Sequence, residues 1–288
     1  MIRASCNDST PLILNATVHG FAIYLDNFAI GDIAEGSITR RKQFIKAIQS
    51  GADVLFSLAN VAELTGPQGK SLATIRGFLD EIGSSWFPLE LDPLTSVKRE
   101  SEINSISARQ IPASRDFLKA FAADRLSESS DRLVDFSQEF FSLGSLIDWL
   151  ASHRESMRAD AAAMDEVLIQ NVNKCRANLD REKEWLDKTL PSERFNPSKP
   201  ATFAFVNLMR TMIIAAKTNP LKKGDGLDFC HAVMASAFAN VATLDKRWKR
   251  RVESLPKPNG LAHIYYAQEL DQMVRDITVA LDPTKKIL

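Results

Sequence analysis

Five acidic side chains stand where carboxylates could do chemistry together. Asp26 ends the run FAIYLD, Glu63 follows the run ADVLFS by six residues, and Asp228 lies early in a helical pattern. Asp245 directly follows NVATL, and Asp225 precedes Asp228 by three residues. Carboxylates gathered in one place repel one another unless a cation neutralises them. The residue types therefore indicate a cation site, provided that the fold brings these positions together.

The ligand chemistry of such a site favours a hard divalent ion. Oxygen ligands alone select Mg²⁺ or Mn²⁺, with water completing the coordination. The four His and three Cys residues are not spaced as zinc ligands. A hard divalent ion can activate water and stabilise charge on a phosphate, which is the basis of metal-assisted phosphodiester hydrolysis.

Each acid also has a purely structural interpretation. Asp26 could bond the backbone of a turn, Glu63 could face water, and Asp245 could cap the helix that follows it. Asp225 and Asp228 could form a capping arrangement, one at the N-cap and one three residues later. Single positions leave both interpretations open, and only the joint pattern favours the cation site.

The elements that must position these acids alternate between strands and helices. Short apolar runs predict strands at 21–26, 52–57, 85–91, 240–244 and 261–266. Such alternation predicts an α/β fold with a parallel sheet of about five strands and helices on both faces. Ligands bind outside the carboxyl ends of such strands, so we expect the acids to converge on one rim of the sheet.

A long segment between the third and fourth predicted strands has only helical patterns. We expect helices near 113–126, 134–151, 155–189 and 201–217. Three prolines in PSERFNPSKP, at 191–200, indicate a linker. The predicted organisation is one discontinuous α/β domain, 18–98 plus 220–288, interrupted by an all-α insertion at 99–219.

The acidic motifs resemble those of PIN-domain nucleases. The stretches that carry the resemblance are IYLDNFAI, VLFSLANVAEL and GDGLDFCHAVMASAFANVATLDKRW. The resemblance implies a three-layer α/β/α fold, a Mg²⁺ or Mn²⁺ cofactor and cleavage of single-stranded or structured RNA without a covalent enzyme intermediate. It assigns the catalytic acids to Asp26, Glu63, Asp228 and Asp245, with Asp225 as an accessory metal ligand. Small PIN toxins have only a few short helices where this chain has its predicted insertion.

Several residues near these motifs could contact a nucleic-acid substrate. The basic block KRWKRR at 246–251 follows Asp245 directly, so its charges could hold a sugar–phosphate backbone, although it could equally be a solvated helix face. GPQGKS at 66–71 lacks the glycine spacing of a P-loop, but its lysine could touch a phosphate. The substrate-contacting residues that we predict are Asn27, Lys70, Thr243, Lys246, Arg247 and Arg250.

Two other functions fit parts of the pattern. The chain could be a non-catalytic PIN-like module that binds RNA or protein through its helical block. It could also be a phosphatase of the haloacid-dehalogenase type, because GDGLD resembles the late acidic loop of that family. That family has a second Asp two residues after its nucleophile, and Phe28 occupies the position here.

Composition limits where and with what the protein works. Lys plus Arg and Asp plus Glu number 36 each, so polyanion binding must come from local patches. Three widely spaced cysteines indicate a reducing setting, and the N-terminus has no signal-peptide pattern. We therefore expect a cytoplasmic protein with an RNA substrate, no membrane association, and a homodimer or an inhibitory partner protein as further possibilities.

Overall fold

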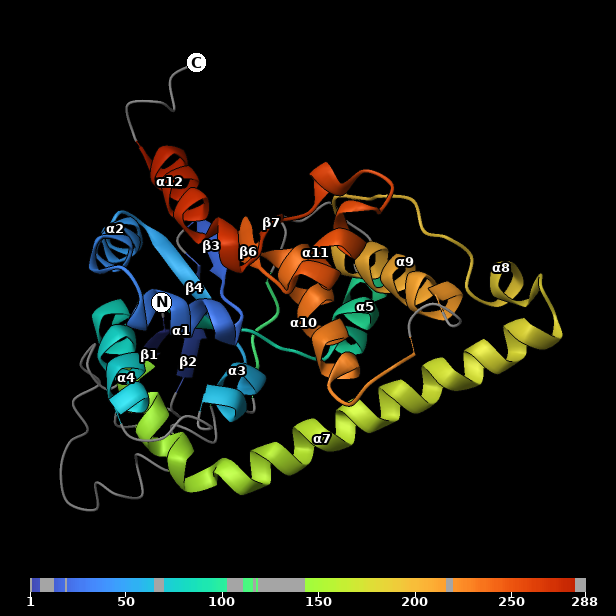
Figure 1. Ribbon diagram of the computed structural model, residues 1–288, viewed down its shortest axis with the longest axis horizontal. Coiled ribbons are helices and arrows are strands. Elements are labelled where there is room, and N and C mark those ends of the chain that lie inside the picture. Colours follow the sequence, from blue (N-terminus) through green and yellow to red (C-terminus); the bar gives the residue numbers. More distant parts are fainter. Residues whose placement is uncertain are drawn as a thin grey trace. The chain divides into compact units, whose positions relative to one another are not determined.

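The computed structural model describes residues 2–5, 13–18, 20–64, 70–102, 111–115, 118, 143–215 and 220–282. The predicted α/β class is confirmed, because five strands form a parallel sheet in the order β5-β4-β3-β6-β7 (Figure 1). The chain divides into two compact units. Unit 1 contains residues 1–90, 112–154 and 267–288, and unit 2 contains residues 91–111 and 155–266.

Unit 1 holds the first three strands of the parallel sheet. They are β3 (Phe21–Tyr24), β4 (Ala52–Phe56) and β5 (Trp86–Pro88). All five residues of β4 are buried, as its continuous run of mostly apolar residues predicts. β5 lies at one end of the strand order and finishes at Pro88, which lacks an N–H for a further ladder bond.

The helices of unit 1 pack their apolar sides on one another and on the strands. α2 contacts both β4 and α12, and α1 contacts α4 (Figure 1). Fully or almost fully buried side chains of α12 include Leu270, Met273, Val274 and Ile277. The helices are α1 (Asn27–Glu35), α2 (Ile38–Gln49), α3 (Leu58–Leu64), α4 (Lys70–Ile82), the 3₁₀ turn η4 (Ala267–Glu269) and α12 (Leu270–Leu281).

A short antiparallel pair near the start of the chain was not anticipated from the sequence. β1 (Ile2–Ser5) pairs with β2 (Ile13–Ala16), and Ile2 lies opposite Ala16. The sequence between these strands contains no two-residue hairpin signal, so pattern analysis had no basis for predicting the pair.

Unit 2 combines helices of the predicted insertion with two strands of the sheet. The strands are β6 (Val241–Thr243) and β7 (His263–Tyr265), which pair in parallel. The helices are α5 (Pro93–Glu102), α7 (Leu143–Arg181, its part from residue 155 onward), α8 (Trp185–Thr189), α9 (Pro200–Ile214), α10 (Asp225–Phe238), α11 (Lys246–Glu253) and the 3₁₀ turn η3 (Pro258–Gly260).

The boundaries of the two units do not follow the predicted domain boundaries. Much of the predicted insertion clusters with α10, β6, α11 and β7, whereas α12 clusters with the N-terminal strands. The helix expected near 113–126 lies mostly outside the described residues, as does the first part of the helix expected at 134–151. The long helix expected near 155–189 is α7, which ends at Arg181, followed by the separate short helix α8.

Helices in the described ranges are too short or too polar to cross a lipid bilayer.

Candidate functional site

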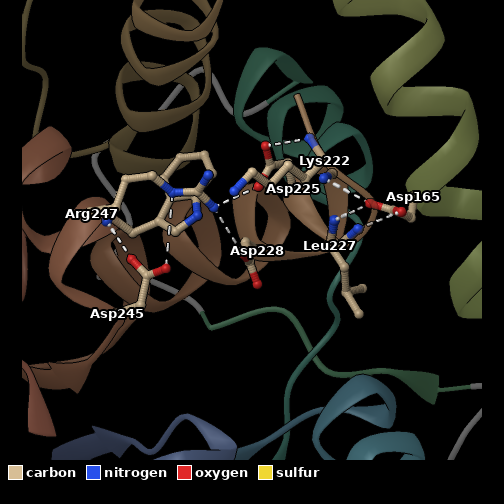
Figure 2. Close-up of polar contacts among 10 residues, drawn as sticks. Asp165, Lys222, Asp225, Leu227, Asp228, Asp245 and Arg247 are labelled. Carbon is tan, nitrogen blue, oxygen red and sulfur yellow. Dashed lines mark hydrogen bonds and ion pairs between the residues drawn. The ribbon is translucent and has the colours of Figure 1, made fainter. Parts of the chain in front are cut away.

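In unit 2 the structure gathers three of the predicted acids around one guanidinium group. Arg247 Nη2 lies 2.6 Å from Asp225 Oδ1 and 3.2 Å from Asp228 Oδ2. Arg247 Nε is 3.9 Å from Asp245 Oδ2. Figure 2 shows these carboxylates approaching the guanidinium from α10 and from the start of α11. The predicted proximity of Asp225, Asp228 and Asp245 is therefore present, with an arginine as the cation between them.

Asp225 is the most deeply placed of the three acids. Its side chain is only 4% exposed, and its Oδ2 accepts a hydrogen bond of 2.9 Å from the Lys222 N–H. The other oxygen takes the bond from Arg247. A buried carboxylate must be paired or hydrogen-bonded, and both conditions hold here, so Asp225 depends on Arg247 for its charge balance.

The N-terminus of α10 is held by an acid from another helix. Asp165 of α7 accepts hydrogen bonds from the N–H groups of Gly224 and Gly226, both at 2.8 Å, and from Leu227 at 3.2 Å (Figure 2). The N-cap residue, Gly224, has no side chain to cap the helix, and its φ of 96° suits glycine. Asp165 therefore satisfies the first N–H groups of α10 and fixes the turn that carries Asp225 and Asp228.

Asp245 is positioned by the junction between β6 and α11. It is the N-cap of α11, and its Oδ1 accepts a 2.7 Å hydrogen bond from the Trp248 N–H. Thr243 is the last residue of β6 and is fully buried. The structure therefore confirms the alternative that Asp245 caps the helix that follows it. The other carboxylate oxygen of Asp245 faces Arg247.

Asp228 has the most perturbed carboxylate of the group. Desolvation, and then the charge of Asp245, raise its pKa from 3.8 to about 6, against the opposing effects of Arg247 and the Trp248 indole. Among the described residues, Trp248 Nε1 has no hydrogen-bond acceptor in normal geometry, so we attribute its effect to proximity to the carboxylate. The arginine does not fully compensate the mutual repulsion of the acids.

In unit 1 the other two predicted acids are linked through Asn27. Asp26 is the N-cap of α1, and its Oδ1 accepts a 2.7 Å hydrogen bond from the Asn27 N–H. The Asn27 side-chain amide donates to Glu63 Oε2. Desolvation raises the pKa of Glu63, and the hydrogen bond from Asn27 opposes that change. The buried Asn27 Oδ1 makes no hydrogen bond with any residue that the structure describes.

A polar pair that sequence analysis missed positions this second group. Asn60 Nδ2 donates a 3.1 Å hydrogen bond to the carbonyl of Leu25, which directly precedes Asp26. Asn60 Oδ1 accepts from the N–H and hydroxyl of Ser57, at 3.0 and 2.9 Å. Both side chains are fully buried. Ser57 and Asn60 therefore tie the start of α3 to the end of β3, and their three-residue spacing at a helix start was the available signal.

The remaining predicted substrate-contacting residues lie at different kinds of position. Lys70 is the first residue of α4. Lys246 is exposed, and its Nζ lies 5.6 Å from the centre of the Tyr266 ring. Arg250 is exposed on α11. Arg247 differs from these, because its guanidinium is already engaged by carboxylates.

Across the described ranges, no three His, Cys, Asp or Glu side chains form a ready-made metal site. The oxygen-only donor set of Asp225, Asp228 and Asp245 fits a hard cation, but only if Arg247 moves from between them. In unit 1, the orphan oxygen of Asn27 beside Asp26 and Glu63 is a further donor of the same kind. Each group of donors is compatible with Mg²⁺ or Mn²⁺, and neither requires it.

Comparisons of the chain with known protein families, curated proteins and solved structures give no match. The resemblance to PIN-domain nucleases therefore rests on the order of the motifs and stays a prediction.

Proposed function

We propose that the protein is a Mg²⁺- or Mn²⁺-dependent ribonuclease with a PIN-like catalytic domain. The observation that carries the proposal is the convergence of Asp225, Asp228 and Asp245 on a single positive group. Asp228, whose pKa is raised by desolvation and by the charge of Asp245, is the kind of perturbed carboxylate found at functional sites. Asp26 and Asp245 each follow the carboxyl end of a parallel strand, which is where open α/β sheets bind ligands.

The proposal gives each group of residues a defined task. Asp228 and Asp245 would be the cation ligands of unit 2, with Asp225 as accessory acid, and Asp26 and Glu63 would be the cation ligands of unit 1. A bound divalent cation supplies Lewis-acid stabilisation of a phosphate and makes water a stronger nucleophile. Asn27 orients Glu63, and the N–H of Trp248 orients Asp245. Lys246 and Arg250 are exposed cations that suit contacts with an RNA backbone.

The test is cleavage of a labelled, mixed-sequence single-stranded RNA in Mn²⁺. We expect wild type to cut, and Asp26→Asn and Asp228→Asn each to lower the rate by about 100-fold or more, because each removes charge from the cation site. Asp160→Asn, an exposed position on α7, is the matched control and should cut like wild type. Full activity in both site variants would contradict the proposal.

Calorimetric titration with Mn²⁺ tests the two groups of acids one at a time. Asp228→Asn should weaken Mn²⁺ binding if the acids of unit 2 bind the cation, and Asp26→Asn should weaken it if the acids of unit 1 do. If neither variant weakens Mn²⁺ binding, the assignment of these acids as metal ligands is wrong.

A non-catalytic binding protein is the second candidate, and Arg247 favours it. The guanidinium already neutralises the acids of unit 2, so this cluster can exist without a metal. In that case wild type binds no Mn²⁺ and cuts no RNA, and substitution of Asp228 changes only the stability of the fold. Binding of RNA in EDTA by an inactive, metal-free protein would support this candidate.

A further inference from the structure

The cationic side chain of Arg251, on α11, is buried, and its terminal nitrogens have no hydrogen-bond partner among the described residues. The residue is 7% exposed, and neither Nη1 nor Nη2 meets an acceptor within the part of the chain that the structure describes. Its guanidinium lies 4.5 Å from the centre of the Trp248 ring. Stacking on an indole compensates part of the lost hydration, but it satisfies none of the N–H groups on the two terminal nitrogens.

The surroundings of Arg251 contain two more arginines. Burial is the main cause that lowers the pKa of Arg251, and the charges of Arg247 and Arg176 lower it further, against Asp225 and Asp245. Arg176 is 8% exposed and donates from Nε and Nη2 to the Met212 carbonyl, at 3.1 and 2.6 Å. Three guanidinium groups therefore share one neighbourhood in unit 2.

The nearby carboxylates are already occupied. Asp225 accepts from Arg247 and from the Lys222 N–H. Asp245 caps α11 through the Trp248 N–H. A buried, unpaired charge is strongly unfavourable, and a guanidinium presents its N–H groups as a planar fork that matches phosphate oxygens. The guanidinium of Arg251 is thus a hydrogen-bond donor of the kind that phosphate ligands require.

We propose that Arg251, with Arg247 beside it on α11, forms a binding site for a phosphate group. The two arginines are four residues apart, so they lie on the same face of the helix. The site requires no metal and no hydrolysis, so the inference goes beyond the proposed function and holds for a nuclease or for a binding protein. The phosphate could belong to a nucleic-acid backbone or to a small phosphorylated molecule, and the chemistry that recognises both is the same.

The first test measures thermal unfolding in EDTA, in sodium phosphate and in sodium chloride of equal ionic strength. We expect phosphate to raise the melting temperature of wild type by about 3 °C through ligand linkage. Arg251→Met should abolish this rise. Arg181→Met removes the same charge from an exposed position at the end of α7, and it should keep the rise.

The melting temperature in chloride separates a ligand site from a structural role. Because neither terminal nitrogen of Arg251 meets an acceptor among the described residues, Arg251→Met should melt at the wild-type temperature or above it when phosphate is absent. A lower melting temperature, or failure to fold, would show that the guanidinium stabilises the fold, and it would overturn the proposal. An equal phosphate response in wild type and Arg251→Met would overturn it as well.

A second measurement, also in EDTA, identifies the source of the phosphate. A ten-residue oligouridylate should bind wild type and Arg181→Met similarly, and Arg251→Met roughly 10- to 100-fold more weakly, if the ligand is a nucleic-acid backbone. If inorganic phosphate shows the Arg251-dependent shift and the oligonucleotide binds all three proteins alike, the ligand is a small phosphorylated molecule. If neither probe depends on Arg251, the site does not exist. Because these measurements are made in EDTA, a negative result rules out the phosphate site without deciding whether the protein cleaves RNA in Mn²⁺.

Discussion

Arg247 determines the charge balance of three acids that would otherwise repel one another. Its guanidinium contacts a buried carboxylate, Asp225, and a half-exposed one, Asp228. This geometry gives the metal-free protein a cation of its own. A divalent ion that binds the same oxygens must therefore compete with an arginine that is tethered two residues after Asp245.

We predict that Arg247→Met destabilises the metal-free protein by about 3 kcal/mol, because it leaves Asp225 buried without its ionic partner. Urea unfolding in EDTA measures this loss, and Arg250→Met is the control. If the acids bind a metal, the same variant should bind Mn²⁺ more tightly than wild type does. A variant as stable as wild type in EDTA would show that Asp225 does not need Arg247.

Asp228 provides a prediction about pH. Its pKa is raised from 3.8 to about 6, so the folded protein holds this proton more tightly than the unfolded chain does. The contribution of Asp228 to stability is therefore greatest below its ordinary pKa, decreases as the pH rises from about 4 to about 6, and stays constant above that range.

We expect Asp228→Asn to raise stability at pH 7 by about 1 kcal/mol, a value reduced for screening because the side chain is 43% exposed. At pH 4 the variant and wild type should be equally stable. Urea unfolding of both proteins from pH 4 to pH 8, in EDTA, gives the comparison. A difference that does not change with pH would contradict the raised pKa.

The sequence shows which acids are candidates, but it does not show which basic residue they meet. Asp225, Asp228 and Asp245 are visible as acids beside predicted element ends, and the structure brings all three to one group. Within KRWKRR, however, one arginine pairs with the acids, one is exposed and one is buried. The buried Arg251 stacks on Trp248, and α11 packs on α9. The periodicity of residues along α11 does not reveal either contact.

At the scale of elements, the contact between α7 and α10 positions the acids of unit 2. Asp165 holds the first N–H groups of α10 from outside that helix. Gly226 makes the close approach possible, since a Cβ there would lie 2.7 Å from the Asp165 carbonyl oxygen and 2.9 Å from its Oδ1. Because the nearest atom belongs to the backbone of Asp165 and not to a flexible side chain, it cannot easily move away from an added Cβ.

We predict that Gly226→Ala destabilises the protein by about 2 kcal/mol, because the added methyl group overlaps Asp165. The matched control is Gly31→Ala in α1, where no heavy atom lies within 4 Å of the added Cβ. That change should stabilise the protein by about 0.5–1 kcal/mol through helix propensity. Guanidinium unfolding measures both. Equal effects of the two substitutions would rule out the close contact as the cause.

Elements with strong local signals could be predicted, and those without them could not. The helical pattern in which Asp228 lies is α10 (Asp225–Phe238), because Gly224 precedes it as the N-cap and an apolar run fills it. The strand expected at 52–57 is β4, within one residue. The segment between β1 and β2 has no hairpin-turn signature in its sequence. The cap that Asp165 of α7 provides for α10 joins residues about sixty positions apart in the chain. Contacts between residues so far apart in the sequence depend on tertiary packing, and the hydrophobic periodicity of the sequence does not indicate them.

At the scale of the whole molecule, the chain passes between its two units several times. Unit 1 is completed by α12, which packs on α2 and places Arg40 Nε 2.5 Å from Asp271 Oδ1. The predicted domain at 220–288 kept α12 together with α10 and α11, because sequence neighbours are the natural first assignment. In the structure α12 belongs to unit 1, whereas α10 and α11 belong to unit 2.

We predict that Ile277→Ala, in α12, destabilises unit 1 by about 3 kcal/mol, since its side chain is fully buried. Val279→Ala on the same helix changes a half-exposed side chain and should stay within about 0.5 kcal/mol of wild type. Hydrogen exchange of β3 and β4 amides is the measurement. Unchanged protection of these strands in Ile277→Ala would show that α12 does not stabilise the sheet of unit 1.

The late position of α12 has a consequence during synthesis. α2 and β4 leave the ribosome early, but the helix that packs on α2 begins about 180 residues after Glu90. At about 5–20 residues per second, translation needs roughly 10–40 s to deliver it. Throughout that interval the apolar face of α2 lacks the helix that packs on it, so we expect this face to be exposed to aggregation until α12 emerges.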